Sequence, residues 1–211
     1  MIERRRNVQR ILLDQINASG IEYMYFVSID YHFKQKDYNR VIEDNRFKRR
    51  KLRTFFKADI HMIDIIEKHR KETSKNYGGY HRHSILEKIP DECWTNPTNS
   101  MMTFMLKLNH EAAIGMKMGQ HPPKEIKEQF ISKVCRDLNR SIPNVYKGTQ
   151  TEAIEDYKGG IKGLIEYLTK DVDIDHPAYE VIDPSSDVDF TLIMDLYNDN
   201  KAGARSQIVF A

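Results

Sequence analysis

Two histidines, His81 and His83, stand two residues apart in the segment GYHRHSILEKI (79–89), which is typical of a β-strand. Alternate residues of a strand project from the same face, so both imidazoles point the same way. A short glycine-containing loop joins this strand to the preceding one at 58–70, and the antiparallel hairpin brings Glu67 opposite the pair. Two imidazoles and a carboxylate would hold a divalent cation with open positions, and this donor set accepts Mg²⁺, Mn²⁺ or Zn²⁺.

The third ligand of this predicted site has two alternatives. His69 shares a strand face with Glu67, and Glu87 shares one with the two histidines. A His-x-His pair also arises easily by chance in a chain with eight histidines, and it then means no more than a polar strand surface. We take Glu67 as the third ligand because it lies close to the hairpin loop.

A second group of reactive residues lies in IEYLTKD (165–171), within a predicted helix at 156–170. Tyr167 and Lys170 are three residues apart, so they are neighbours on one helix surface, with Asp171 beside them. A tyrosine hydroxyl has a reference pKa of about 10, and a nearby cation favours its phenolate, which is the nucleophilic form. The alternative is an ordinary amphipathic helix end, where a lysine interacts favourably with the helix dipole.

These two groups form part of an ordered set of three short blocks. YFVSID (25–30) is a hydrophobic strand with a central hydroxyl residue, followed by GYHRHSILE (79–87) and IEYLTKD (165–171). In this order and context the blocks resemble the motifs of the HUH endonuclease superfamily, specifically the single-tyrosine rolling-circle replication initiators (Rep proteins). The resemblance covers residues 21–175.

The resemblance implies a fold and a reaction. The family fold is an antiparallel sheet of about five strands, similar to the ferredoxin and RRM folds, with flanking helices. Mg²⁺ or Mn²⁺ would be held by His81, His83 and Glu67. Tyr167 would attack a phosphorus of single-stranded DNA and form a 5′-phosphotyrosine, while Lys170 would place the phosphate or stabilise the phenolate. The implied function is nicking and joining at an origin or element end, which initiates rolling-circle replication of a plasmid or virus.

Some features depart from the family pattern or leave other functions open. Arg82 stands between the histidines where the family usually has an apolar residue, and the insertion at 91–140 is long. Tyr157 is an alternative nucleophile. A transposase with the same chemistry and a non-catalytic nucleic-acid-binding module are the alternative functions. The chain lacks a GxxxxGK[ST] phosphate-binding motif, so a separate helicase and polymerase are expected partners.

The rest of the chain supplies elements that would position these residues in an α+β domain. We expect residues 1–175 to form the nickase domain, and residues 176–211 to form an acidic extension that packs on the same domain. The region 91–99 is expected to be a turn, and the end, 203–211, is either a final strand or the edge of a longer protein. Further strands are predicted at 21–33 and 142–154, and further helices at 3–18, 36–57, 100–118, 123–140 and 188–197.

Charge is distributed unevenly along the 211 residues, although the formal net charge is only +2. Residues 1–57 carry 14 Lys/Arg against 7 Asp/Glu, whereas 171–200 carry 9 acids and no Lys or Arg. The densest basic run, RFKRRKLRTFFK (46–57), predicts DNA contacts by Arg49, Arg50, Lys51 and Arg53. The alternative is a solvated helix face whose phenylalanines belong to the core.

Composition excludes several classes of protein. A hydrophobic content of 40% and an aromatic content of 10% exclude a largely disordered chain. No apolar run approaches the roughly 20 residues that span a bilayer, and the basic N-terminus is not followed by the apolar core of a secretion signal. The two cysteines are expected to be reduced, which predicts a cytoplasmic protein, or a nuclear one in a eukaryotic host, with no membrane partner.

Overall fold

An antiparallel sheet lies at the centre of the fold in our computed structural model, which describes residues 2–29, 31, 34–69, 72–73, 77–142, 150–154, 159–170 and 182–183. Its strands in these residues are β1 (Tyr23–Ile29), β2 (Met62–Lys68), β3 (Tyr80–Glu87) and β4 (Gln150–Ala153). Their order is β2-β3-β1-β4, so the strand with both histidines is an interior one. A bridge between Ile65 and Ile182 adjoins β2. The predicted α+β class is confirmed, with four strands described where about five were expected.

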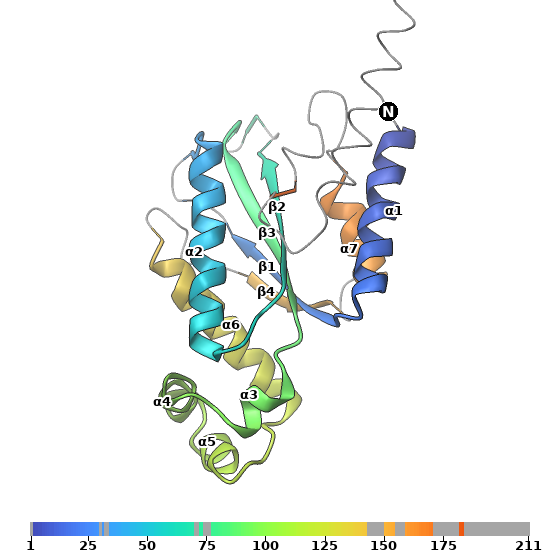
Figure 1. Ribbon diagram of the computed structural model, residues 1–211. Helices are drawn as coiled ribbons and strands as arrows, with labels where there is room; N and C mark the ends of the chain where they lie inside the picture. The colour runs from blue at the N-terminus through green and yellow to red at the C-terminus, as the bar shows by residue number, and fades with distance from the viewer. Residues whose placement is uncertain are drawn as a thin grey trace, which may run out of the picture.

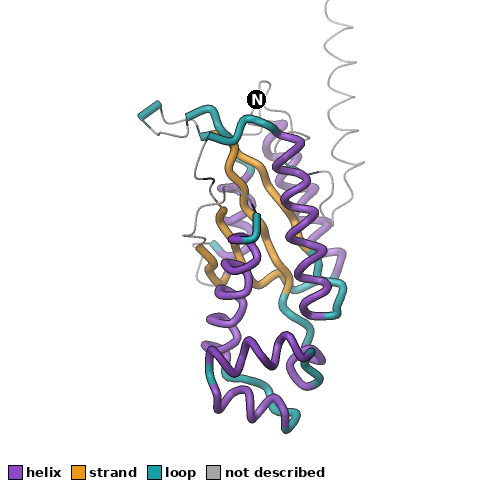
Figure 2. Tube along the Cα trace, turned by 90° about the vertical axis from the view of Figure 1, so that its left-hand side faces the viewer, coloured by secondary structure: helices purple, strands orange, loops and turns teal. Residues whose placement is uncertain are grey.

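Helices cover both faces of the sheet (Figure 1). One face carries α2 (Tyr38–Phe56) and α6 (Lys124–Arg140), and the other carries α1 (Ile2–Ser19) and α7 (Gly160–Leu168). The turned view in Figure 2 shows the strands between these helices. Three shorter helices gather beyond the end of β3: α3 (Asp91–Thr95), α4 (Asn99–Leu108) and α5 (His110–Lys117). None of the described helices is both long and apolar enough to cross a bilayer.

Capping side chains explain where several helices begin. The Asp37 carboxylate accepts a hydrogen bond from the backbone N–H of Arg40 at the start of α2, and Thr98 caps α4 in the same way. The helix predicted over 100–118 is in fact two helices. Asn109 interrupts it, because this extended residue ends α4 and its side chain caps α5.

The prediction of a turn over 91–99 is wrong in its first half, since α3 occupies Asp91–Thr95. Pro90 precedes this helix, and the acidic Asp91 and Glu92 in its first turn favour it through the helix dipole. The turn prediction missed the burial of Cys93 and Trp94, which anchor the short helix in the core.

The C-terminal predictions are covered only partly by the described residues. The strand predicted over 142–154 is observed at Gln150–Ala153, and the helix predicted over 156–170 at Gly160–Leu168. The helical pattern at 188–197 and the last segment, 203–211, lie outside the described residues. Of the acidic extension, Ile182 and Asp183 are described, and both are fully buried against the domain.

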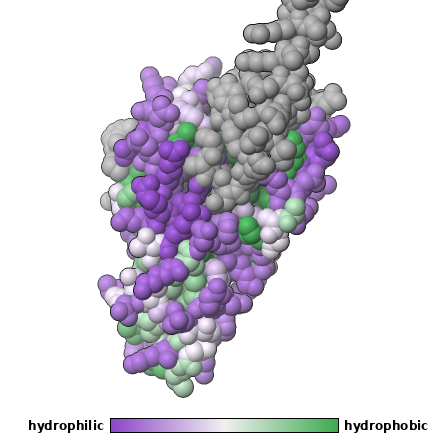
Figure 3. Space-filling view, in the orientation of Figure 1, coloured by the Kyte–Doolittle hydropathy of each residue, from purple (hydrophilic) through white to green (hydrophobic). Residues whose placement is uncertain are grey.

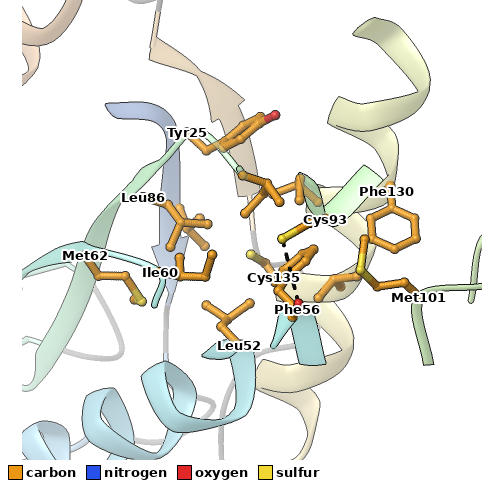
Figure 4. Close-up of a cluster of buried hydrophobic side chains, with 14 of the residues drawn as sticks. Tyr25, Leu52, Phe56, Ile60, Met62, Leu86, Cys93, Met101, Phe130 and Cys135 are labelled. Carbon is orange, nitrogen blue, oxygen red and sulfur yellow. Dashed lines mark hydrogen bonds between the residues drawn. The ribbon is translucent and has the colours of Figure 1, made fainter. Parts of the chain in front are cut away.

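Two hydrophobic clusters hold the helices on the sheet. The larger one lies between the sheet and the α2–α6 side and extends into α3–α5; Figure 4 shows Leu52, Ile60, Leu86 and Phe130 from it. Both cysteines are buried thiols, and burial raises the pKa of each to about 11, so they are unreactive side chains of this core. The smaller cluster lies under α1 and α7 and includes Val8, Ile85 and Leu164.

A buried ionic network lies between α2 and the sheet, around Asp64 of β2. The Asp64 carboxylate accepts a hydrogen bond from Arg49 at 2.6 Å and a second from Ser84, and it pairs with the ammonium of Lys48 at 3.6 Å. Burial lowers the pKa of Lys48 to about 8, partly offset by the Asp64 charge. Burial also opposes ionisation of Asp64, but the two cations outweigh it and lower the pKa of that carboxyl.

Replacing Asp64 by asparagine should destabilise the protein by about 3 kcal/mol, because it leaves two buried cations uncompensated. Urea unfolding followed by circular dichroism measures the change. The matched control is Asp59→Asn, which removes an acid that pairs with Arg53 while being 72% exposed. That exposed pair should change stability by less than about 0.5 kcal/mol. Equal, small effects of both substitutions would contradict the structural importance of this network.

Candidate metal centre

Glu67, His81 and His83 meet at one end of the β2–β3 hairpin. In this register Glu67 lies directly opposite His81, and His83 lies opposite Ile65. The Nε2 atom of His81 is 3.0 Å from Oε2 of Glu67, and that of His83 is 3.7 Å from the same oxygen. One donor atom from each residue lies within 4.8 Å of the others, and the group forms a possible metal site. The predicted ligands are therefore brought together.

Contacts from β1 fix the orientation of the His83 ring. Ser28 is the cross-strand partner of His83, and its hydroxyl lies 2.7 Å from Nδ1 of the imidazole. The ring of Phe26 stacks on the imidazole, with 5.2 Å between centroids. A hydrogen bond at Nδ1 leaves Nε2 as the atom that faces Glu67, which is how metal-binding histidines are usually held. The sequence marked Ser28 only as a central hydroxyl of its strand, and its cross-strand register is what reveals the contact.

The chemistry of these donors fits a divalent cation. Nε2 of His83 is buried and makes no hydrogen bond in the described structure, an arrangement that is costly for a polar atom with no further role. Two imidazole nitrogens and a carboxylate oxygen suit Mn²⁺ or Zn²⁺ well and Mg²⁺ through the oxygen. The structure shows the donor group and leaves the identity of the ion open.

The two alternative third ligands lie elsewhere. Glu87 is at the far end of β3, where its carboxylate lies 2.9 Å from Nδ1 of His61. His69 follows β2 and its ring packs at a tilt against that of His81, with centroids 4.3 Å apart, but it is outside the converging group. Among the described residues, Glu67 is thus the acid that completes the histidine pair.

Arg82, between the two histidines, points to the opposite face of the sheet, as expected. Its side chain is fully buried and donates a hydrogen bond from Nη1 to the side chain of Asn45 at 2.9 Å. Asn45 also donates to the carboxylate of Asp183 at 2.8 Å. Asn45 therefore binds one nitrogen of this guanidinium, while its Nε and Nη2 make no hydrogen bond to the described residues, and the metal ligands on the other face are not displaced.

Electrostatics keep the Glu67 carboxylate ionised. Burial raises the pKa of Glu67, but contacts with His81 and His83 and the charge of Lys170 outweigh it, so the pKa lies well below its usual range. Burial lowers the pKa of His83, partly offset by Glu67. An ionised carboxylate beside a neutral imidazole is the protonation state that a metal ligand set requires.

Lys170, which follows α7, reaches the same carboxylate. Its ammonium nitrogen lies 3.1 and 3.3 Å from the two oxygens of Glu67 and 3.8 Å from the ring centroid of Tyr167. Tyr167 is 43% exposed, so solvent reaches its side chain. Lys170 therefore contacts both the predicted nucleophile, Tyr167, and one of the predicted metal ligands, Glu67. Asp171 and Tyr157 lie outside the described residues.

Packing against α1 holds α7 in this position. Leu164, Ile165 and Leu168 are fully buried in the smaller hydrophobic cluster, together with Leu12 of α1. At the end of α7 the side chain of Gln9 donates a hydrogen bond to Thr169 at 3.0 Å. The helix starts after Gly159, whose φ of 86° is accessible to glycine at little cost. A glycine at this position therefore helps the helix to begin here.

The four predicted DNA contacts do not share one environment. Arg49 is buried in the Asp64 ion pair, so its guanidinium is unavailable to a DNA backbone. Arg53 pairs with Asp59 at 2.8 Å. Arg50 and Lys51 are exposed on α2, which covers the face of the sheet opposite α7 and the metal ligands. The basic run is therefore divided between core and surface, and its exposed part lies away from the metal centre.

Comparisons with protein-family models, curated proteins and solved structures found no match. Any function assigned to this chain therefore rests on its own residues and their geometry.

Replacing Lys170 by methionine should tighten binding of Mn²⁺ by about tenfold, equivalent to about 1.4 kcal/mol. The Lys170 ammonium pairs with the carboxylate that a metal ion would use, so the ion must compete with an internal cation. Isothermal titration calorimetry measures the affinity. Lys162→Met, on the exposed side of the same helix, is the control and should leave it unchanged. An affinity that is unchanged or weaker in Lys170→Met would show that the lysine does not compete.

Proposed function

We propose that this chain is a metal-dependent nuclease of the HUH type, which nicks and rejoins single-stranded DNA through a covalent phosphotyrosine. The observation that carries the proposal is the contact of Lys170 with Glu67, which places the Tyr167 helix beside the two histidines. The interior position of the histidine strand in an antiparallel sheet also agrees with the HUH fold, similar to ferredoxin and RRM domains.

The roles of the residues follow from their positions. Tyr167 supplies the oxygen that attacks the scissile phosphorus, forming a phosphotyrosine bond as the bond to the 3′ oxygen breaks. The departing 3′ oxygen takes up a proton and becomes a free hydroxyl. The ammonium of Lys170, 3.8 Å from the centroid of the tyrosine ring, would attract the scissile phosphate.

A divalent cation bound by Glu67, His81 and His83 would neutralise charge on the phosphate oxygens. The reaction exchanges one phosphodiester for another, so the 3′-hydroxyl can later attack the phosphotyrosine and reseal the strand without a nucleotide cofactor. A protein with this chemistry suits initiation of rolling-circle replication on a plasmid or virus, with single-stranded DNA at an origin as substrate. A separate helicase and polymerase would then complete replication.

Incubation with a pool of single-stranded oligonucleotides tests the proposal. With Mn²⁺ or Mg²⁺ present, a protein–DNA adduct should appear as a shifted band on a denaturing gel, and EDTA should prevent it. Sequencing the captured DNA would identify the origin or element end. Binding of DNA without an adduct, and without any effect of metal, would contradict the nuclease and support a non-catalytic binding module.

A further inference from the structure

The outward face of α2 carries two cations that no acid in the described residues neutralises. In the basic run 46–57, Lys48 and Arg49 pair with Asp64, and Arg53 pairs with Asp59. Arg46 and Arg50 are exposed, and neither forms an ion pair with a described residue. Like charges four residues apart on a helix repel one another, so this pair costs stability in the absence of an anion.

These two arginines line a groove between α2 and the end of α6. The groove has a volume of about 370 Å³ and is also lined by Phe47, Ser141 and Ile142. Its acids, Glu43 and Asp44, lie 3.7 and 3.2 Å from the guanidinium of Arg40 and are paired with it. The groove thus combines a half-buried aromatic ring with two guanidinium groups that have no ion-pair partner among the described residues.

This combination matches the repeating chemistry of a nucleic-acid strand. Guanidinium groups bind phosphates, and an aromatic ring offers a stacking surface for an unpaired base. In Figure 3 strongly hydrophilic side chains gather over the position of α2. Phe47 packs in part against the larger hydrophobic cluster, and the ammonium of a third exposed cation, Lys51, lies 5.4 Å from its ring centroid, so the groove offers a row of cations beside a partly exposed ring.

We propose that this groove binds single-stranded DNA at a second site, on the face of the sheet opposite the metal centre. The choice of DNA as the occupant rests on the proposed function. A strand held at both sites would pass around the edge of the sheet, so the protein would bind long oligonucleotides more tightly than short ones.

Charge reversal in the groove tests this site. The Arg46→Glu/Arg50→Glu double variant should bind a 30-nucleotide single strand at least about tenfold more weakly, measured by fluorescence anisotropy in EDTA at low salt. Loss of two phosphate contacts should lower the slope of log affinity against log salt by about 1.4. Phe47→Leu should weaken binding about fivefold by removing the stacking surface. The control is Lys107→Glu/Lys117→Glu, which makes the same charge change on exposed positions of α4 and α5.

The outcomes distinguish failure of the groove proposal from failure of the nuclease proposal. An equal loss in the control variant, or no loss in the arginine variant, would overturn the groove proposal even if the DNA adduct forms. Loss of binding confined to the arginine and Phe47 variants would support the groove even if no adduct forms. A loss for duplex DNA as large as for the single strand, with no effect of Phe47→Leu, would also contradict a single-strand site. Unchanged circular dichroism and Mn²⁺ affinity confirm that each variant is folded.

Discussion

His83→Ala should abolish binding of divalent metal and reduce DNA nicking at least about 1,000-fold. His83 contributes a buried nitrogen that faces Glu67 and makes no hydrogen bond of its own. Mutation of a residue that only hydrogen-bonds to a metal ligand typically lowers metal affinity or activity 10- to 100-fold. Removal of a ligand itself should therefore have a larger effect. Isothermal titration with Mn²⁺ measures the first effect, and the yield of protein–DNA adduct measures the second.

The control for this variant is His110→Ala, which removes an exposed histidine at the start of α5. It should keep wild-type metal affinity and adduct yield. If His83→Ala folds normally and still binds Mn²⁺ as tightly as the control, the metal site lies elsewhere and the proposed centre is wrong.

Tyr167→Phe should eliminate the covalent adduct while leaving Mn²⁺ affinity unchanged. The substitution removes the attacking oxygen and keeps the ring over which the Lys170 ammonium lies. Loss of a nucleophile lowers the rate of covalent catalysis by at least about 1,000-fold. The denaturing gel measures adduct, and calorimetry measures metal affinity.

Tyr77→Phe is a closely matched control, because Tyr77 is 44% exposed and Tyr167 is 43% exposed. It should form adduct at the wild-type rate. An adduct that persists in Tyr167→Phe would contradict the assignment and point to another nucleophile, with Tyr157 the first to test.

The geometry of the metal ligands was predictable because it depends on short-range rules. Period-two alternation places His81 and His83 on one face and Arg82 on the other, and a hairpin brings Glu67 across from them. The partner of Lys170 was not predictable in the same way. Its contact with Glu67 joins residues 103 positions apart, and it depends on how α7 packs against α1.

The basic run of α2 shows a further limit of sequence patterns. Charge density alone predicts a cationic surface, yet Lys48 and Arg49 turn inward because the sheet presents a buried acid, Asp64, opposite them. The helical period indicates which positions of α2 face inward. Whether a buried cation is stable at such a position depends on an acid on the facing strand. The short helix α3 was missed for a similar reason, since the burial of Trp94 against the rest of the domain adds to the weak local signal of the acids in its first turn.

The most direct test of this account is to identify the residue that carries DNA. Adduct formed with Mn²⁺ and single-stranded DNA is digested with protease and nuclease, and tandem mass spectrometry locates the remaining nucleotide. We predict a phosphodiester on Tyr167, in the peptide that ends at Lys170. A nucleotide on any other residue, or no adduct from a protein that binds both metal and DNA, would contradict it.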